Sequence, residues 1–454
     1  MILAASDDVA GRAQAARLAI ATALLALLFV FFANLAAQAS VDIQKVRSKS
    51  GVEAWLVEDY SVPIVTIRFA FGSGSAADPE GKDGVANLIT SLFDEGAGDL
   101  DSEAFQIRLD DAGAEMSFNA GRDNIYGSMR VLAESRPEAF ELLRLALTQP
   151  RFDAAPVARM KSQALAGLRA SENDPNTLAG RRWLRALYGD HPYARPSDGT
   201  EQTLNAITVD DLRAFHRAAF VRSDLHVAVV GAIDAETLAT ELDRLFGTLP
   251  EASTLPAVAD VDPKLDQEVR YDYPLPQARL QLSYPGLSRD DPQFFAAALV
   301  NHILGGGSFT SRLFKEVREA RGLAYGVESN LATYRHANAL VIGTSTRADK
   351  AEETLGVIRD VVRRMAEEGP TAEELEAAKK YVIGAYAVNN LDSSASIAAT
   401  LVELQIDDLG IDYIDRRADL INAVTLADAK AAAQRLLNAE PAVLVVGPVP
   451  EPAN

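Results

Sequence analysis

The sequence predicts an α+β protein built from two homologous, duplicated domains, each a mostly antiparallel sheet packed with helices. Two observations predict this class: short apolar β-runs alternate with helical patterns along the chain, and one unit occurs twice. Residues 207–233 read ITVDDLRAFHRAAFVRSDLHVAVVGAI, and residues 424–449 read VTLADAKAAAQRLLNAEPAVLVVGPV. Each copy opens with a Thr, Thr208 or Thr425, followed three positions later by an acidic residue, which is typical of a helix cap. Each copy then runs through a helix into a strand that ends in Val-Val-Gly.

The same offset of about 217 residues relates other parts of the chain. A strand-like segment at 64–71 matches 279–284, and a helical segment at 156–170 matches 372–386. We therefore expect an N-terminal domain over 41–250, a linker over 251–267 that is rich in Pro and acidic residues, and a C-terminal domain over 268–454.

The first 39 residues have the layout of a secretory signal peptide. Arg12 and Arg17 precede an apolar run over 18–33, and Ala37-Gln38-Ala39 supplies small residues at the usual cleavage spacing. This pattern predicts export to the periplasm. The alternative is a retained membrane anchor, because the apolar run approaches the roughly 20 residues that span a bilayer. Contact with a membrane is expected only in that case.

Composition excludes several classes of function. The 454 residues are 48% hydrophobic and 24% charged, which is ordinary for a globular protein. Asp plus Glu number 64 against 44 Lys plus Arg, a net charge of −20, which disfavours binding to nucleic acid. The chain has no cysteine, so disulfides, thiolate metal sites and a cysteine nucleophile are excluded.

Residue types alone identify no active site. None of the five histidines lies three or four positions from another, so no helix face presents a histidine pair to a metal ion. The sequence has neither a Gly-x-Ser-x-Gly elbow nor a P-loop. We expect His216 and His226 to be structural, in a helix and a strand, and His191 to lie in a loop.

A glycine-rich stretch at 304–309 precedes an expected helix at 311–320. A helix start of this kind can bind an anion, but without the P-loop lysine a flexible connection is favoured. Beyond it, Arg318 is expected late in the helix and Tyr325 at the start of a strand at 324–331. These two side chains could converge on a carbonyl group. The alternative, favoured by residue chemistry alone, pairs Arg318 with a neighbouring glutamate and packs Tyr325 into the sheet.

Over most of its length the chain resembles the insulinase/pitrilysin family of zinc peptidases, the inverzincins, and especially their short, mitochondrial-processing-peptidase-like branch. The resemblance covers about 41–448 in both halves. The motifs that carry it are the Gly72 to Gly84 approach, His191-Pro192-Tyr193 with Gly199-Thr200, the two Val-Val-Gly strands, and Ser311-Arg312-Leu313-Phe314 continuing to Arg321-Gly322-Leu323-Ala324-Tyr325.

This resemblance implies that the zinc site is degenerate. The family motif His-x-x-Glu-His supplies two zinc ligands and the general base. The matching positions here are Asn87, Thr90 and Ser91, and the third ligand falls near 164–168, with Gly167 as the best match. None of these residues is a credible zinc ligand or base. We therefore expect the chain to bind no metal and to hydrolyse no peptide by itself.

The resemblance also implies a retained substrate-binding pair. In the family, an Arg and a Tyr seven residues apart in the second domain bind the substrate backbone and polarise the scissile carbonyl. Arg318 and Tyr325 match them at that separation. In some two-chain bacterial members, one chain carries the zinc motif and the other carries this pair.

The expected function is therefore that of the zinc-less, non-catalytic subunit of an exported heterodimeric metallopeptidase. Zinc would belong to a homologous partner bearing the His-x-x-Glu-His motif, and the substrate would be a peptide or an unfolded polypeptide. One alternative is a non-enzymatic peptide-binding or assembly protein with the same fold. The other is an independent enzyme with a relocated metal site that uses His302.

Overall fold

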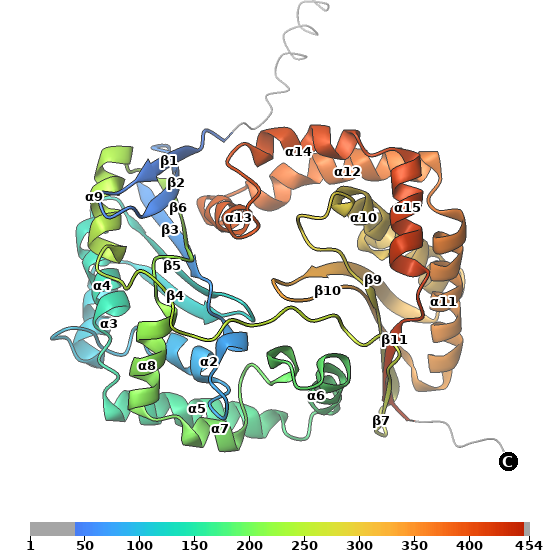
Figure 1. Ribbon diagram of the computed structural model, residues 1–454, viewed down its shortest axis with the longest axis horizontal. Helices are drawn as coiled ribbons and strands as arrows, with labels where there is room; N and C mark the ends of the chain where they lie inside the picture. The colour runs from blue at the N-terminus through green and yellow to red at the C-terminus, as the bar shows by residue number, and fades with distance from the viewer. Residues whose placement is uncertain (1–40, 449–454) are drawn as a thin grey trace, which may run out of the picture. The chain divides into compact units, whose positions relative to one another are not determined.

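The N-terminal half forms a six-stranded sheet (Figure 1). The computed structural model describes residues 41–448, and the signal peptide expected over residues 1–39 lies outside them. Both sheets of the described chain belong to one compact unit that begins at Ile43. The first sheet has the order β1-β2-β6-β3-β5-β4, from β1 (Gln44–Arg47), β2 (Glu53–Glu58), β3 (Ile64–Phe71), β4 (Glu115–Ala120), β5 (Ile125–Leu132) and β6 (Leu225–Gly231).

Helices pack against this sheet and bury one continuous apolar core with it. Phe69 and Phe71 on β3 are fully buried there, with Phe220 and Phe246 from the helical layer in ring contact. The helices of this half are α2 (Val85–Thr90), α3 (Ser102–Asp111), α4 (Arg136–Thr148), α5 (Ala154–Ser171), α6 (Pro175–Tyr188), α7 (Glu201–Ala206), α8 (Val209–Ala219) and α9 (Ala235–Phe246).

The C-terminal half repeats the design with a five-stranded sheet of order β7-β11-β8-β10-β9. Its strands are β7 (Glu268–Asp272), β8 (Gln277–Pro285), β9 (Ala324–Thr333), β10 (Asn338–Arg347) and β11 (Ala442–Gly447). Its helices are α10 (Phe294–Asn301), α11 (Ala351–Glu368), α12 (Ala372–Asn390), α13 (Ser394–Ile406), α14 (Tyr413–Asn422) and α15 (Leu426–Leu437).

The two sheets share one topology, which confirms the predicted fold class and duplication. The order β2-β6-β3-β5-β4 in the first sheet corresponds to β7-β11-β8-β10-β9 in the second. In each, the strand ending in Val-Val-Gly pairs parallel to its outer neighbour and antiparallel to its inner one. Gly231 ends β6 at a φ of 134°, and a Cβ there would lie 2.0 Å from the carbonyl oxygen of Ile64. That close approach requires glycine.

Both predicted helix caps are present as capping boxes. The Thr208 hydroxyl accepts from the backbone N–H of Asp211, whose carboxylate accepts from the backbone N–H of Thr208. Thr425 and Asp428 make the same two bonds at the start of α15. Each box satisfies two of the backbone donors left free at a helix start.

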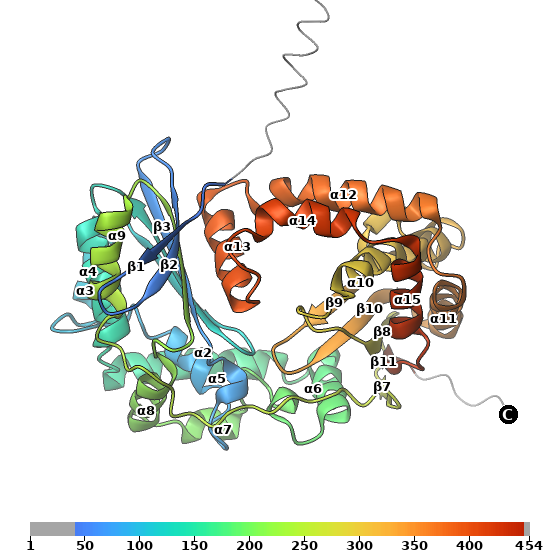
Figure 2. The same ribbon diagram turned by 45° about the horizontal axis from the view of Figure 1, so that its top comes forward.

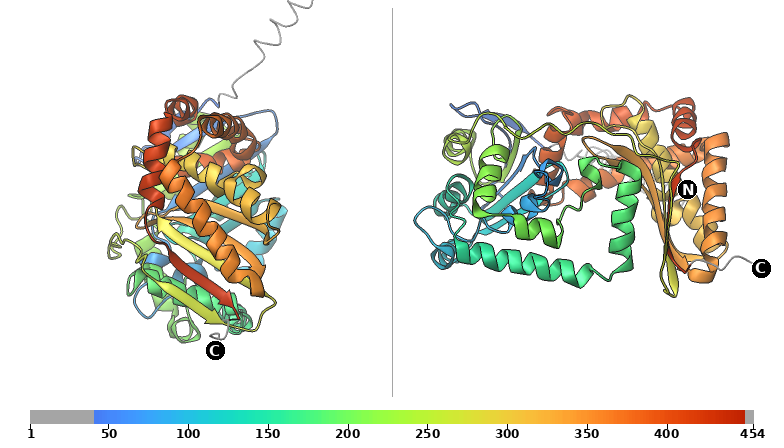
Figure 3. Two further views of the ribbon diagram at one scale, coloured as in Figure 1. Left: turned by 90° about the vertical axis from the view of Figure 1, so that its right-hand side faces the viewer. Right: turned by 60° about the horizontal axis from the view of Figure 1, so that its bottom comes forward.

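The halves exchange equivalent helices, which the sequence analysis did not predict. Helix α6 packs on β7 and β11 of the second sheet (Figure 3). There Ala179, Trp183 and Leu187 join a small apolar cluster with Leu444 and Val446. In return, α13 packs on β3 and β6 of the first sheet (Figure 2). The two helices are related by the repeat offset, so the exchange is reciprocal.

Helix α13 also binds the first sheet through a side chain that makes the two backbone hydrogen bonds a neighbouring strand would make. The amide of Gln405 accepts from the backbone N–H of Val227 at 3.3 Å and donates to the carbonyl oxygen of Val227 at 3.0 Å. Val227 precedes the stretch of β6 that pairs with β2, which begins at Ala228. The side chain therefore satisfies backbone groups on the side of β6 that β2 leaves uncovered.

The glycine-rich stretch is not the flexible connection that we expected from the sequence. Residues His302–Gly306 form a π-helical turn that continues α10 and packs on β9. A Cβ on Gly305 would lie 2.6 Å from Oγ of Ser329, so glycine permits this approach. The helix expected at 311–320 is observed over 312–319, with Phe314–Glu319 in π-helical form. His191, expected in a loop, caps the short 3₁₀ helix Pro192–Ala194.

Candidate functional site

Three of the four degenerate zinc-site positions line one pocket. Asn87 on α2, Ser91 at the end of α2 and Gly167 on α5 border a cavity of about 500 Å³. Thr90 is not among the lining residues. The family resemblance therefore predicted residues that the fold brings together across 76 positions of sequence, from Ser91 to Gly167.

The side chains at these positions do not fit a zinc ion. The hydroxyls of Thr90 and Ser91 donate to the carbonyl oxygens of Asn87 and Leu88, at 2.8 and 2.7 Å. The Asn87 amide donates to the carbonyl oxygen of Ser197 at 2.8 Å. Gly167 offers no donor atom. Zinc sites in proteins use imidazole, thiolate or carboxylate ligands, and the amide and hydroxyl groups here are instead hydrogen-bonded to backbone carbonyls.

Helix α2, which positions Asn87 and Ser91, begins at a buried carboxylate. Gly84 precedes the helix at a φ of 96°, and Asp78 accepts from the backbone N–H groups of Gly84 and Ala86 at 2.6 and 3.1 Å. Burial raises the pKa of Asp78 to about 7, although these two bonds and the nearby Arg195 guanidinium favour the ionised form.

Arg318 and Tyr325 form a contact pair on the second half. Arg318 lies in the π-helix Phe314–Glu319, and its guanidinium carbon is 4.4 Å from the ring centre of Tyr325, the second residue of β9. Gly322 turns the chain between them at a φ of 61°. The backbone N–H groups of Gly322 and Leu323 bond back to Arg318 and Val317, which ends the helix at a left-handed glycine.

The surroundings of this pair exclude the packed, ion-paired alternative. Tyr325 is 85% exposed. Among residues 41–448, Arg318 has no carboxylate partner, because Glu316 pairs with Arg321 and Arg364 instead. The guanidinium rests on aromatic rings and its N–H groups remain free for a ligand. Within the described chain, no hydrogen bond or ion pair joins this surface to the pocket on the first half.

Two aromatic residues that the sequence analysis missed complete the Arg318 environment. The guanidinium carbon lies 4.9 Å from the ring centre of Phe314 and 5.8 Å from that of Phe309, which is 67% exposed. Phe309 ends the glycine-rich stretch and Phe314 lies in the Ser311–Phe314 motif of the family resemblance, but neither pattern indicated a contact with Arg318.

His302, considered for a relocated metal site, stacks on Tyr381 with ring centres 5.0 Å apart. Burial lowers its pKa. Within residues 41–448, no group of three or more His, Cys, Asp or Glu side chains is placed to hold a metal ion. The structure therefore provides no support for a metal site at this histidine.

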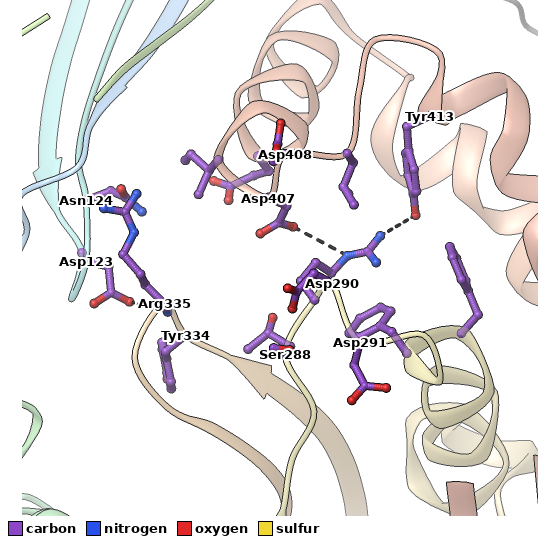
Figure 4. A pocket seen from close by; sticks show the side chains of 18 of the residues that line it. Asp123, Asn124, Ser288, Asp290, Asp291, Tyr334, Arg335, Asp407, Asp408 and Tyr413 are labelled. Atoms are coloured by element: carbon purple, nitrogen blue, oxygen red, sulfur yellow. Dashed lines mark hydrogen bonds and ion pairs between the residues drawn. The ribbon is translucent and has the colours of Figure 1, made fainter. Parts of the chain in front are cut away.

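A larger cavity of about 930 Å³ is lined by loops, helices and strand ends of both halves (Figure 4). Arg289, after β8, donates to the Tyr413 hydroxyl at 2.6 Å and pairs with Asp407 at 3.6 Å. Its guanidinium carbon also lies 4.1 Å from the ring centre of Phe294. The guanidinium of Arg289 is thus bound by its neighbours, and no sequence pattern indicated this cluster.

The helices of residues 41–448 include none that is long and apolar enough to cross a membrane.

The fold thus places Asn87, Ser91 and Gly167 around one pocket and sets Arg318 in contact with Tyr325 on the second half. Two family models match it: the insulinase family (peptidase family M16) over residues 54–201 and the peptidase M16 inactive domain over residues 206–382. The chain is 25% identical to the non-peptidase homolog YmxG of Helicobacter pylori, covering 83% of this chain and 87% of that protein.

Solved structures of the same family have the same fold as this chain. A crystal structure of a peptidase M16 inactive domain from Pseudomonas fluorescens is 31% identical, with a TM-score of 0.83, and the match covers 90% of this chain and 98% of that one. The periplasmic protease PqqL from Escherichia coli has the same fold at 17% identity and a TM-score of 0.76, with 90% of this chain matched to 46% of that longer chain. The chain belongs to the insulinase family, peptidase family M16, and is an inactive peptidase homologue within it.

Proposed function

We propose that this chain is the zinc-less subunit of an exported heterodimeric peptidase. Its partner would be a homologous chain that carries the His-x-x-Glu-His motif and the zinc ion. Arg318 and Tyr325 would bind the backbone of a peptide or unfolded polypeptide and polarise the carbonyl that the partner's site attacks. The exposed, carboxylate-free contact between these two side chains is the observation that carries the proposal.

The chemistry of the pair suits this role. An arginine supplies five N–H donors in a fixed fork, and a tyrosine supplies one hydroxyl donor. Donors that are already aimed at a developing oxyanion stabilise the transition state, and one such donor contributes about 100- to 1,000-fold in rate. The aromatic rings under Arg318 hold its guanidinium without consuming those donors.

Two further observations support a partner and an exported location. The match to PqqL covers less than half of that chain, so this fold also occurs in a protein of roughly twice the length. The basic, apolar and small-residue pattern over residues 1–39 is that of a secretory signal. We therefore propose that the complex is periplasmic, or bound to the membrane if the segment is retained.

The test is purification of the tagged protein from its native host, followed by assay of the complex for chelator-sensitive peptide cleavage. The co-purifying chain is identified, and the pair is reconstituted with Arg318→Ala or Tyr325→Phe. Each substitution should lower kcat/KM by about 100-fold, since each removes a donor to the oxyanion.

Matched controls separate this role from a change in folding. Arg321→Ala removes a neighbouring arginine that is already paired with Glu316, and Tyr60→Phe removes the hydroxyl of another exposed tyrosine. Both controls should leave kcat/KM unchanged. Unchanged rates with Arg318→Ala and Tyr325→Phe would contradict the shared site. A stable complex without peptidase activity would favour the assembly-protein alternative.

A further inference from the structure

The 500 Å³ cavity on the first half is open along one wall because that wall has a glycine, Gly167, with no side chain. Gly167 lies inside the 18-residue helix α5, where glycine costs about 1 kcal/mol relative to alanine. A Cβ at this position would meet no atom within 4 Å, so neither packing nor backbone geometry requires glycine. What glycine provides at this position is open space beside Asn87 and Ser91.

The polar groups around this space present acceptors. The Asn87 amide nitrogen is occupied by the carbonyl of Ser197 and by Oδ1 of Asp198, at 2.8 and 3.4 Å, and the Ser91 hydroxyl hydrogen is occupied by the carbonyl of Leu88. Oδ1 of Asn87, Oγ of Ser91 and the carboxylate of Asp198 therefore remain available to a ligand as acceptors, and the side chains of Gln163 and Ser171 also line this space.

The charge of the pocket is also one-sided. Neither Lys nor Arg is among its lining residues, and Asp198 has no ion-pair partner in the described part of the chain. The remaining wall is largely apolar, from Leu88, Met160, Leu168 and Leu204. One uncompensated carboxylate above apolar walls favours a cation that brings its own apolar stem.

The loop that carries Asp198 is fixed against α2. A Cβ on Gly84 would lie 2.9 Å from the carbonyl oxygen of Asp198, and a Cβ on Gly199, at a φ of 75°, would lie 2.2 Å from the carbonyl oxygen of Asp83. These glycines allow the loop and the start of α2 to approach closely. The backbone that carries the exposed Asp198 side chain is thus held in place before any ligand arrives, which lowers the entropy cost of binding.

We propose that this pocket binds a primary ammonium group on an aliphatic stem, as presented by a lysine side chain or by the N-terminus of a peptide. An ammonium group brings three donors to the acceptors of Asn87, Ser91 and Asp198, and the stem would lie along the apolar wall. The site lies in the first half, and its occupation does not depend on the role assigned to Arg318 and Tyr325.

The test measures binding to the purified full chain by titration calorimetry with four small probes. They are Nα-acetyl-lysine N-methylamide, its Nε-acetyl derivative, the corresponding arginine compound, and leucine amide with a free α-amine. The lysine probe or leucine amide should bind saturably, and which of the two binds more tightly identifies the source of the ammonium. Nε-acetylation should weaken the binding of the lysine probe at least tenfold, because it removes the charge.

Two variants and one matched control locate the site. Gly167→Leu fills the open wall and Asp198→Asn removes the charge, and each should weaken binding at least tenfold. Gly384→Leu changes another helix-interior glycine without close neighbours, 217 residues later on α12, and should bind like the wild type. Thermal unfolding of all three verifies that they fold.

The inference is overturned if neither amine binds, if the arginine or Nε-acetyl probe binds as tightly as lysine, or if both Gly167→Leu and Asp198→Asn bind normally. These outcomes leave the Arg318 and Tyr325 assay untouched, so failure of one proposal is distinguishable from failure of the other.

Discussion

At the scale of single residues, buried polar groups control the geometry of the degenerate site. Asp78 is 3% exposed and holds the first turn of α2 through two backbone N–H groups. Burial disfavours its charge more strongly than those bonds favour it, so its pKa is about 7. The folded state therefore binds a proton that the unfolded chain releases near pH 4.

We predict that Asp78→Asn changes the pH dependence of stability. A carboxyl whose pKa is raised on folding stabilises the protein fully below its unfolded pKa, and this contribution is lost as pH rises toward the folded pKa. Between about pH 4 and pH 7, the unfolding free energy of the wild type should therefore fall relative to that of Asp78→Asn. Urea unfolding at several pH values measures this difference. A difference that is constant over the range would contradict the raised pKa.

At the scale of elements, helix starts and glycine turns set the positions of the candidate site residues. In both copies of the repeat, the helix before the Val-Val-Gly strand starts with the same capping box. Within residues 41–448, only the box of the first copy has an added partner, because Lys82 pairs with Asp211 at 2.7 Å. On the second half, the π-helix and Gly322 bring Arg318 over Tyr325. π-Helical turns are rare and often occur at functional sites.

We predict that Thr208→Ala and Thr425→Ala destabilise the protein to a similar extent. Each substitution removes one side-chain acceptor from a helix start, which costs about 1 kcal/mol of unfolding free energy. Denaturant unfolding of both variants gives the values. As a control, Thr240→Ala alters an exposed threonine inside α9, away from any cap, and should cost less. If the unfolding free energy of either variant equals that of the wild type, its capping box does not stabilise the helix.

At the scale of the whole molecule, the two halves depend on each other. Helix α6 buries Trp183 against the second sheet, and α13 covers the first sheet. Each half therefore contributes one helix to the other, and each would expose an apolar face if it stood alone. Burial of such side chains provides the main favourable free energy of folding.

We predict that chains covering residues 41–250 and 268–454 do not fold stably when they are produced separately. Each would expose apolar surface that α6 or α13 covers in the intact chain, so aggregation or non-cooperative unfolding is expected. Size-exclusion chromatography and thermal unfolding measure the outcome. Co-production of the two pieces is the control and should restore a soluble complex. Two separately soluble, cooperatively unfolding pieces would disprove this dependence.

Local patterns made part of this structure predictable. The Thr caps, the strand at Ile64–Phe71 and the helices at Ala154–Ser171 and Ala372–Asn390 follow from periodicity and capping residues, which act over a few positions. The helix exchange was not predictable, because an amphipathic helix has an apolar face but does not specify which sheet that face covers. The glycine-rich turn was misjudged for a similar reason, since its contact with Ser329 is made across the fold.

Residue identity and order alone establish the duplication, the absence of zinc-binding side chains at Asn87, Thr90, Ser91 and Gly167, and the seven-residue spacing of Arg318 and Tyr325. The packed fold was needed to show that Gly167 opens a pocket beside Asn87, and that aromatic rings rather than carboxylates surround Arg318. Both depend on distances between segments far apart in the chain, and those distances are fixed only when the sheets and their exchanged helices pack together.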